Sequence, residues 1–238
     1  MEEDNKPEPI LAEPVMASIN ETGPEPTDRG MSLIDVIYGL LFAPTATFRK
    51  ISHRPPLGYA FIVFTAVTLI STLIAVWAPP VSPRLASDMP GQMSRVMMSM
   101  LPYFGLMGAV FAFLNWFVLA GVFQLFSEFF GGRGRALGVL AVLGLSELPG
   151  IFTGPINLIT HFMEQSSLSI FISVSSGLLI LIWRFILIVI GLRAVQEYST
   201  GRAVITVLAP GIILFLLAVA MVIAMVGVMI PMINYLPK

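Results

Sequence analysis

The segment AVITVLAPGIILFLLAVAMVIAMVGVMI, residues 203–230, decides the fold class, because it contains no charged residue. A helix rises about 1.5 Å per residue and needs about 20 apolar residues to cross about 30 Å of hydrocarbon. This segment is longer than that requirement. It therefore predicts a helix that spans a membrane.

Four further apolar segments of similar length precede it, at residues 57–77, 103–127, 136–159 and 168–192. The first two contain no charged residue, the third contains only Glu147, and the fourth contains only Arg184. The segments between them are rich in proline, glycine and charged residues, which end helices and favour loops. The sequence predicts an all-α integral membrane protein with a five-helix transmembrane bundle over residues 57–238.

Composition supports the same class. Hydrophobic residues make up 56% of the chain and charged residues only 11%, whereas soluble domains carry about 25% charged residues. The chain contains no cysteine, which excludes disulfides, thiolate metal sites and cysteine nucleophiles.

Residues 1–30 differ sharply from the rest of the chain, since they hold eight acidic residues and five prolines against only Lys6 and Arg29. Such a segment cannot bury enough apolar surface to offset the entropy lost on ordering. We expect a disordered, solvated acidic tail; a docking peptide for a partner is the alternative. The start MEEDNKPEPI lacks the basic and apolar regions of a signal peptide, so we expect the first span to direct the chain to the membrane.

Residues 31–56 form a third kind of segment. Apolar residues recur there at helical spacing, first at Leu33, Val36, Ile37, Leu40 and Leu41 and then at Phe48 and Ile51. Basic residues lie beside the second group, at Arg49, Lys50 and Arg54. An apolar stripe next to cations, in helices too short to span, predicts an amphipathic segment in the headgroup plane. Packing of these helices on the end of the bundle is the alternative.

The distribution of lysine and arginine beside the spans predicts the orientation. Seven lie on the N-terminal side of the bundle, at Arg49, Lys50, Arg54, Arg133, Arg135, Arg193 and Arg202. Three lie on the other side, at Arg84, Arg95 and Lys238. The N-terminus should therefore face the cytoplasm and the C-terminus the opposite side.

Polar residues inside the spans are candidate site residues, because charges at membrane depth are costly and usually pair or line a pathway. Counted from the same side, Glu147 and Arg184 differ in depth by about 4.5 Å, and Asn115 falls near the same level. We expect an intramembrane polar cluster in which Glu147 and Arg184 form an ion pair. Asn115 or the carbonyl of Leu145, which Pro149 leaves without its helical donor, would share a hydrogen bond. Structural pairing and a substrate or ion pathway are both open interpretations.

No catalytic constellation is evident. The sequence has no phosphate-binding loop of the GxxxxGKS type and no HExxH motif, and its only histidines are His53 and His161. Ser146 has no histidine or lysine at its depth to act as a base. We expect no enzyme activity, no cofactor, no metal and no nucleic-acid partner.

The order of these features resembles the Yip-domain family, the Ypt-interacting proteins, and is similar to its bacterial-type members. Four stretches carry the resemblance: LLFAPTATFRKI at 40–51, GGRGRALGVLAVLGLSELP at 131–149, IWRFILIVIGLRAV at 182–195 and EYSTGRA at 197–203.

The resemblance implies a cytoplasmic N-terminal region followed by five spans. Eukaryotic members are associated with Rab-type GTPases and vesicle traffic, but no residue set for GTPase binding can be placed on this sequence. We expect a non-enzymatic membrane scaffold or adaptor, in membrane organisation or a trafficking-like process. Its partners would be the lipid bilayer and a membrane or cytoplasmic protein. The alternative is a small transporter or permease component that uses Asn115, Glu147 and Arg184.

Overall fold

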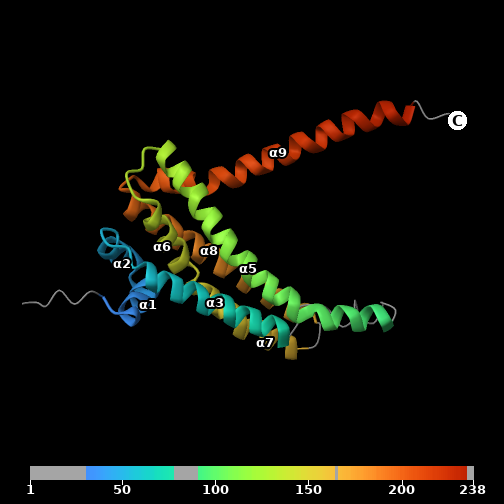
Figure 1. Ribbon diagram of the computed structural model, residues 1–238, viewed down its shortest axis with the longest axis horizontal. Helices are drawn as coiled ribbons and strands as arrows, with labels where there is room; N and C mark the ends of the chain where they lie inside the picture. The colour runs from blue at the N-terminus through green and yellow to red at the C-terminus, as the bar shows by residue number, and fades with distance from the viewer. Residues whose placement is uncertain (1–30, 78–90, 164–165, 235–238) are drawn as a thin grey trace, which may run out of the picture. The chain divides into compact units, whose positions relative to one another are not determined.

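The computed structural model describes residues 31–77, 91–163 and 166–234, and these residues are almost entirely helical (Figure 1). Five of the helical stretches are long and apolar enough to cross a membrane. The predicted fold class, an all-α membrane protein with five spans, is confirmed. The acidic tail predicted for residues 1–30 lies outside the described residues.

The helices follow one another in a simple order. Two short helices come first and the spans follow: α1 (Leu33–Phe42), α2 (Pro44–Ile51), α3 (Leu57–Trp77), α5 (Gly91–Phe129), α6 (Ala136–Ser146), the 3-10 helix η1 (Leu148–Phe152), α7 (Thr153–Phe162), α8 (Ser167–Gln196) and α9 (Thr200–Asn234).

Helix α6 forms the centre of the bundle, since it packs against α3, α5 and α8. Its side chains are almost completely buried over most of its length. Small residues allow this close packing: a Cβ on Gly144 would lie 2.7 Å from the Trp116 ring and 3.0 Å from the Ala60 carbonyl oxygen. Trp116 also donates a hydrogen bond from Nε1 to the Leu140 carbonyl, at 3.1 Å.

The third span is not one continuous helix, in contrast to the segment predicted over 136–159. It consists of α6, η1 and α7, and the change of helix type follows Glu147. Pro149 explains the change, because it has no N–H to donate to the carbonyl of Leu145 and its ring disfavours an α-helical residue before it. The span therefore carries a 3-10 turn at membrane depth.

The short helices α1 and α2 lie beside the start of α3, and α2 packs against α8 (Figure 1). Phe48 is fully buried in this contact, and a Cβ on Gly191 of α8 would lie 3.0 Å from its ring. The apolar side of α2 is thus used in packing on the bundle end.

Candidate functional site: an intramembrane ion pair and an arginine-bearing loop

The third span places Glu147 at the last residue before the 3-10 turn, where it faces α8. There Nη2 of Arg184 donates to Oε1 of Glu147. This is the only ion pair within the described ranges. The structure thus brings together the two charges that the sequence places at similar depth.

The ion pair is not sealed inside the bundle. The Arg184 side chain is 39% exposed and that of Glu147 is 24% exposed. Beside the pair, the rings of Phe152 and Trp183 stack with centroids 6.1 Å apart. Pairing neutralises the two charges, as charges at this depth require.

Asn115 does not join this pair. It lies on an exposed part of α5, and no hydrogen bond among the described residues connects it to Glu147 or Arg184. A similar depth in the membrane is not enough to bring Asn115 to the ion pair, because a contact also requires that the side chain face the pair around the helix axis. The buried neighbour of Glu147 is instead Ser146, whose hydroxyl has no hydrogen-bond partner among the described residues.

A second polar site lies at the end of the bundle where α5 turns into α6. The last turn of α5 closes with two hydrogen bonds, from the Gly131 N–H to the Glu128 carbonyl at 3.0 Å and from the Gly132 N–H to the Ser127 carbonyl at 2.7 Å. Gly131 has φ +82°, the left-handed conformation that favours glycine at this position of a helix end. The helix therefore ends in a Schellman motif.

Gln196, at the end of α8, holds the loop that follows. Its side chain is completely buried. Its Oε1 accepts a hydrogen bond from the Gly134 N–H at 2.8 Å, and its Nε2 donates to Oε1 of Gln124 at 2.8 Å. Its backbone carbonyl accepts from the Arg133 N–H at 3.2 Å. We call Gln124, Gln196 and the loop 131–135 the glutamine clasp.

A different structural constraint favours glycine at each of the three glycine positions of the motif GGRG. Gly131 supplies the left-handed turn. A Cβ on Gly132 would lie 2.6 Å from the side-chain oxygen of Gln196, and a Cβ on Gly134 would collide with the carbonyl of Val195. Side chains at these positions would push α8 away from the loop. The loop is therefore defined by close packing as well as by its hydrogen bonds.

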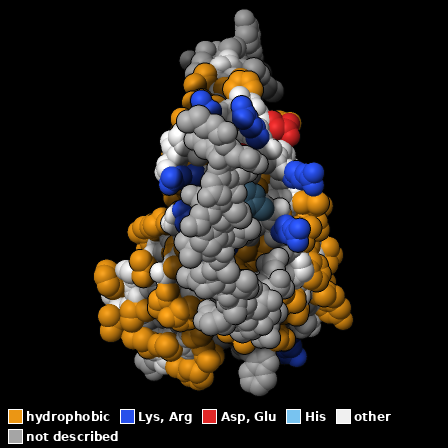
Figure 2. Space-filling model, turned by 90° about the vertical axis from the view of Figure 1, so that its left-hand side faces the viewer, with side chains coloured by type: hydrophobic (Ala, Val, Ile, Leu, Met, Phe, Trp, Pro, Cys, Tyr) orange, Lys and Arg blue, Asp and Glu red, His pale blue; other side chains and the backbone are white. Residues whose placement is uncertain are grey.

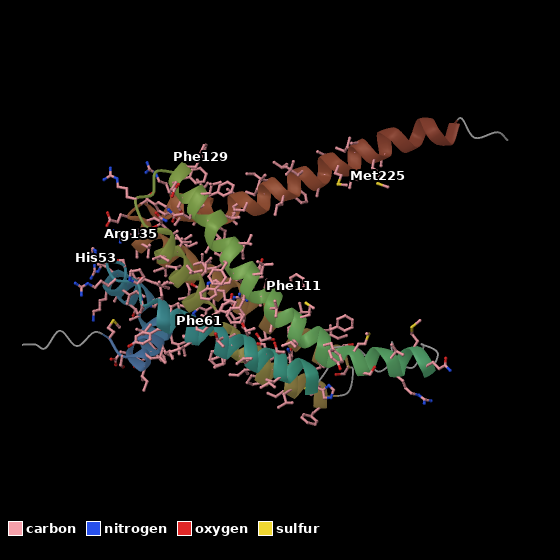
Figure 3. All side chains as sticks on the ribbon, in the orientation of Figure 1. His53, Phe61, Phe111, Phe129, Arg135 and Met225 are labelled. Carbon is pink, nitrogen blue, oxygen red and sulfur yellow. The ribbon has the colours of Figure 1, made fainter. Side chains whose placement is uncertain are left out.

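The clasp places arginines at one end of the bundle. The side chains of Arg133 and Arg135 are exposed on the loop, and Arg202 lies next to it, with Nη1 3.5 Å from a Cβ placed on Gly131. Arg193, in the last turn of α8, is exposed as well. Figure 3 shows Arg135 and His53 at the same end.

The predicted juxtamembrane basic residues belong to this end too. Arg49 and Lys50 lie in the last turn of α2 and Arg54 lies just after it, and all three are exposed. Figure 2 shows lysine and arginine side chains around this face with few acidic side chains between them. Among the described residues, no carboxylate lies within ion-pairing distance of these cations.

Sequence reasoning found the ion pair but missed the clasp. Glutamines near helix ends carry no motif, and Gln124 and Gln196 are far apart in the sequence. The available signal was the run GGRG together with glutamine at the end of a span, since a glycine run between apolar helices indicates close backbone contact. The glycine run does not indicate which helix the loop contacts; in the structure that helix is α8.

Comparison with known proteins assigns the family. No curated protein and no solved structure matches the chain. The model of the Yip1 domain family matches residues 38–222, a region that includes the clasp, the ion pair and all but the end of the last span. This chain, a multi-pass membrane protein, belongs to the Yip1 domain family.

Proposed function

We propose that this protein is a non-enzymatic membrane scaffold or adaptor, and that its contact surface is the arginine-bearing end held by the glutamine clasp. The observation that supports this most is the combination of a defined loop with exposed arginines that have no ion-pair partner among the described residues. A loop that only connects two spans needs neither a buried glutamine nor two closely packed glycines, Gly132 and Gly134. Membership of a family of membrane proteins agrees with such a role.

The chemistry of the surface indicates the kind of partner. Arg133 and Arg135 present planar guanidinium groups that bind carboxylates in pairs of hydrogen bonds. Because the loop is held in place, little conformational entropy is lost when a partner binds. A protein with an acidic surface on the cytoplasmic side would fit.

Photo-crosslinking in native membranes tests this proposal. A photoreactive residue at Ala136, exposed beside Arg135, should crosslink a discrete partner, and Arg133→Gln with Arg135→Gln should abolish that product. The matched control places the same group at the exposed Met93, at the start of α5. A product that persists without the two arginines, or that forms equally at Met93, would contradict the proposal.

A second candidate function, a transport pathway, is favoured by one observation. The third span changes helix type at Glu147, beside a partly exposed ion pair, and transporters often bind substrates at broken helices. Proton flux into proteoliposomes would test it: a flux that depends on Glu147 and Arg184 supports a pathway. Equal flux in the double variant Glu147→Gln, Arg184→Gln and in the unchanged protein contradicts a proton pathway.

A further inference from the structure

Helix α1 is apolar on two opposite sides. On its inner side Val36 and Leu40 are completely buried. On its outer side Ile34 is 76% exposed, Tyr38 64% and Phe42 71%. Spacing by four residues places these three side chains along one line of the helix. We call them the outer stripe.

The outer stripe contains the exposed large apolar side chains of α1 and α2. The inner side chains of α2, Phe48 and Ile51, are buried in the bundle and cannot also enter a membrane. Within the stripe, the rings of Tyr38 and Phe42 contact each other, with centroids 4.7 Å apart.

Cations lie on the helix next to the outer stripe, whereas the charged residue of α1 itself is the exposed Asp35. Helix α2 packs directly against α1, and the Thr47 side chain lies against Gly39. The exposed Arg49 and Lys50 follow on α2. An apolar stripe with an aromatic residue, flanked by cations, is the pattern of a helix that lies in a membrane interface. The tyrosine suits this level because its ring is apolar and its hydroxyl is polar.

The placement of α1 in the chain points to the same partner. At about 1.5 Å per residue the helix is too short to span. It packs through α2 on the end of α8, and only a few residues separate α2 from the start of the first span at Leu57. A stripe held at the end of spanning helices lies near the membrane surface.

We propose that the outer stripe, Ile34, Tyr38 and Phe42, inserts into the lipid leaflet at this end of the bundle, with Arg49 and Lys50 bound to the phosphates of anionic lipids. The residues differ from those that the sequence pattern suggested, because Val36, Leu40, Phe48 and Ile51 pack on the bundle instead. The inference is independent of the protein partner proposed above, since it concerns only α1 and α2.

The absence of cysteine from the chain allows a direct test with single spin labels in the full protein. Ile34→Cys and Phe42→Cys would report from the stripe, and His53→Cys, an exposed position just after α2, would serve as the control. The labelled protein is reconstituted into vesicles of phosphatidylcholine alone or of phosphatidylcholine with phosphatidylserine. Collisions with lipid-soluble oxygen and with a water-soluble nickel chelate are then measured.

Labels at positions 34 and 42 should collide with oxygen and be protected from nickel, whereas a label at 53 should collide with nickel. Phosphatidylserine should increase the protection, and Arg49→Gln with Lys50→Gln should remove that increase. Nickel access at 34 and 42 equal to that at 53 would overturn the proposal. Protection from both reagents would overturn it too, because it would mean that a protein surface covers the stripe.

Discussion

The two polar sites of this protein differ in whether their charged side chains are paired. At membrane depth, Arg184 turns inward to Glu147, and the two charges neutralise each other. At the end of the bundle, the neutral side chains of Gln124 and Gln196 hold the backbone. The arginines of the loop are exposed, and no carboxylate of the described residues lies within ion-pairing distance of them. We propose that the first site stabilises the bundle and that the second makes contacts outside it.

The largest effect should come from breaking the ion pair. Glu147→Ala or Arg184→Ala leaves one charge unpaired at membrane depth, and loss of a partner in a buried pair costs about 3–5 kcal/mol. Because Arg184 is 39% exposed, we expect the lower end of that range or less. Folded yield in membranes should fall for each single variant and largely recover in the double variant. A double variant as poor as the worse single one would contradict this role.

Opening the glutamine clasp should have the next largest effect. Gln196→Ala leaves the half-buried Gly134 N–H without its acceptor; a buried unsatisfied donor costs about 1–3 kcal/mol, and we expect the lower part of that range. Thermal unfolding in detergent measures the change, and hydrogen exchange should increase in the loop 131–135. Gln124→Ala leaves Nε2 of the buried Gln196 without its acceptor, so it should be destabilising as well. Asn115→Ala, at an exposed amide on α5 outside the clasp, is the matched control and should cost little. Equal stability of Gln196→Ala and the unchanged protein would show that the clasp does not hold the loop.

The two sites also differ in how far they could be predicted. Five spans and the pairing of Glu147 with Arg184 follow from apolar length and from depth along a helix, which are one-dimensional quantities. The position of Asn115 required knowledge of direction around the helix axis. The 3-10 turn is a local effect of Pro149, which the apolar length of the segment does not reveal. The clasp required knowledge of which span lies beside the loop, because its hydrogen bonds join residues of α5 and α8 that are far apart in the sequence.

An effect of similar size is expected from the glycine contacts of the clasp. In Gly132→Ala the new methyl group would lie 2.6 Å from Oε1 of Gln196 and 2.9 Å from the Ser127 carbonyl, so we expect a loss of about 1–3 kcal/mol, as for other overpacked sites. Gly177→Ala, where nothing lies within 4 Å, should be neutral or stabilising by up to about 1 kcal/mol. Thermal unfolding of the two variants side by side measures the contrast. Similar unfolding midpoints for the two variants would contradict the prediction, because they would mean that the loop accommodates a methyl group at position 132.

The next prediction concerns the orientation of the protein in the membrane and does not depend on its stability. We propose that the clasp faces the cytoplasm, on the grounds of the lysine and arginine distribution. Reporter fusions at Gly132 and Gly201 should then give cytoplasmic signals, and fusions at Ser87 and Lys238 the opposite. A cytoplasmic signal at both Gly201 and Lys238 would remove the fifth span from the membrane and contradict this topology.

One measurement separates the roles of the two sites most directly: the yield of the crosslinked product from Ala136 in two double variants that fold to similar levels. We predict that Arg133→Gln with Arg135→Gln abolishes the product, because these side chains make the contact. We predict that Glu147→Ala with Arg184→Ala leaves the yield per folded molecule unchanged, because that pair only supports the bundle. Loss of the product in the second variant and its survival in the first would contradict the assignment of contact to the loop and of support to the ion pair.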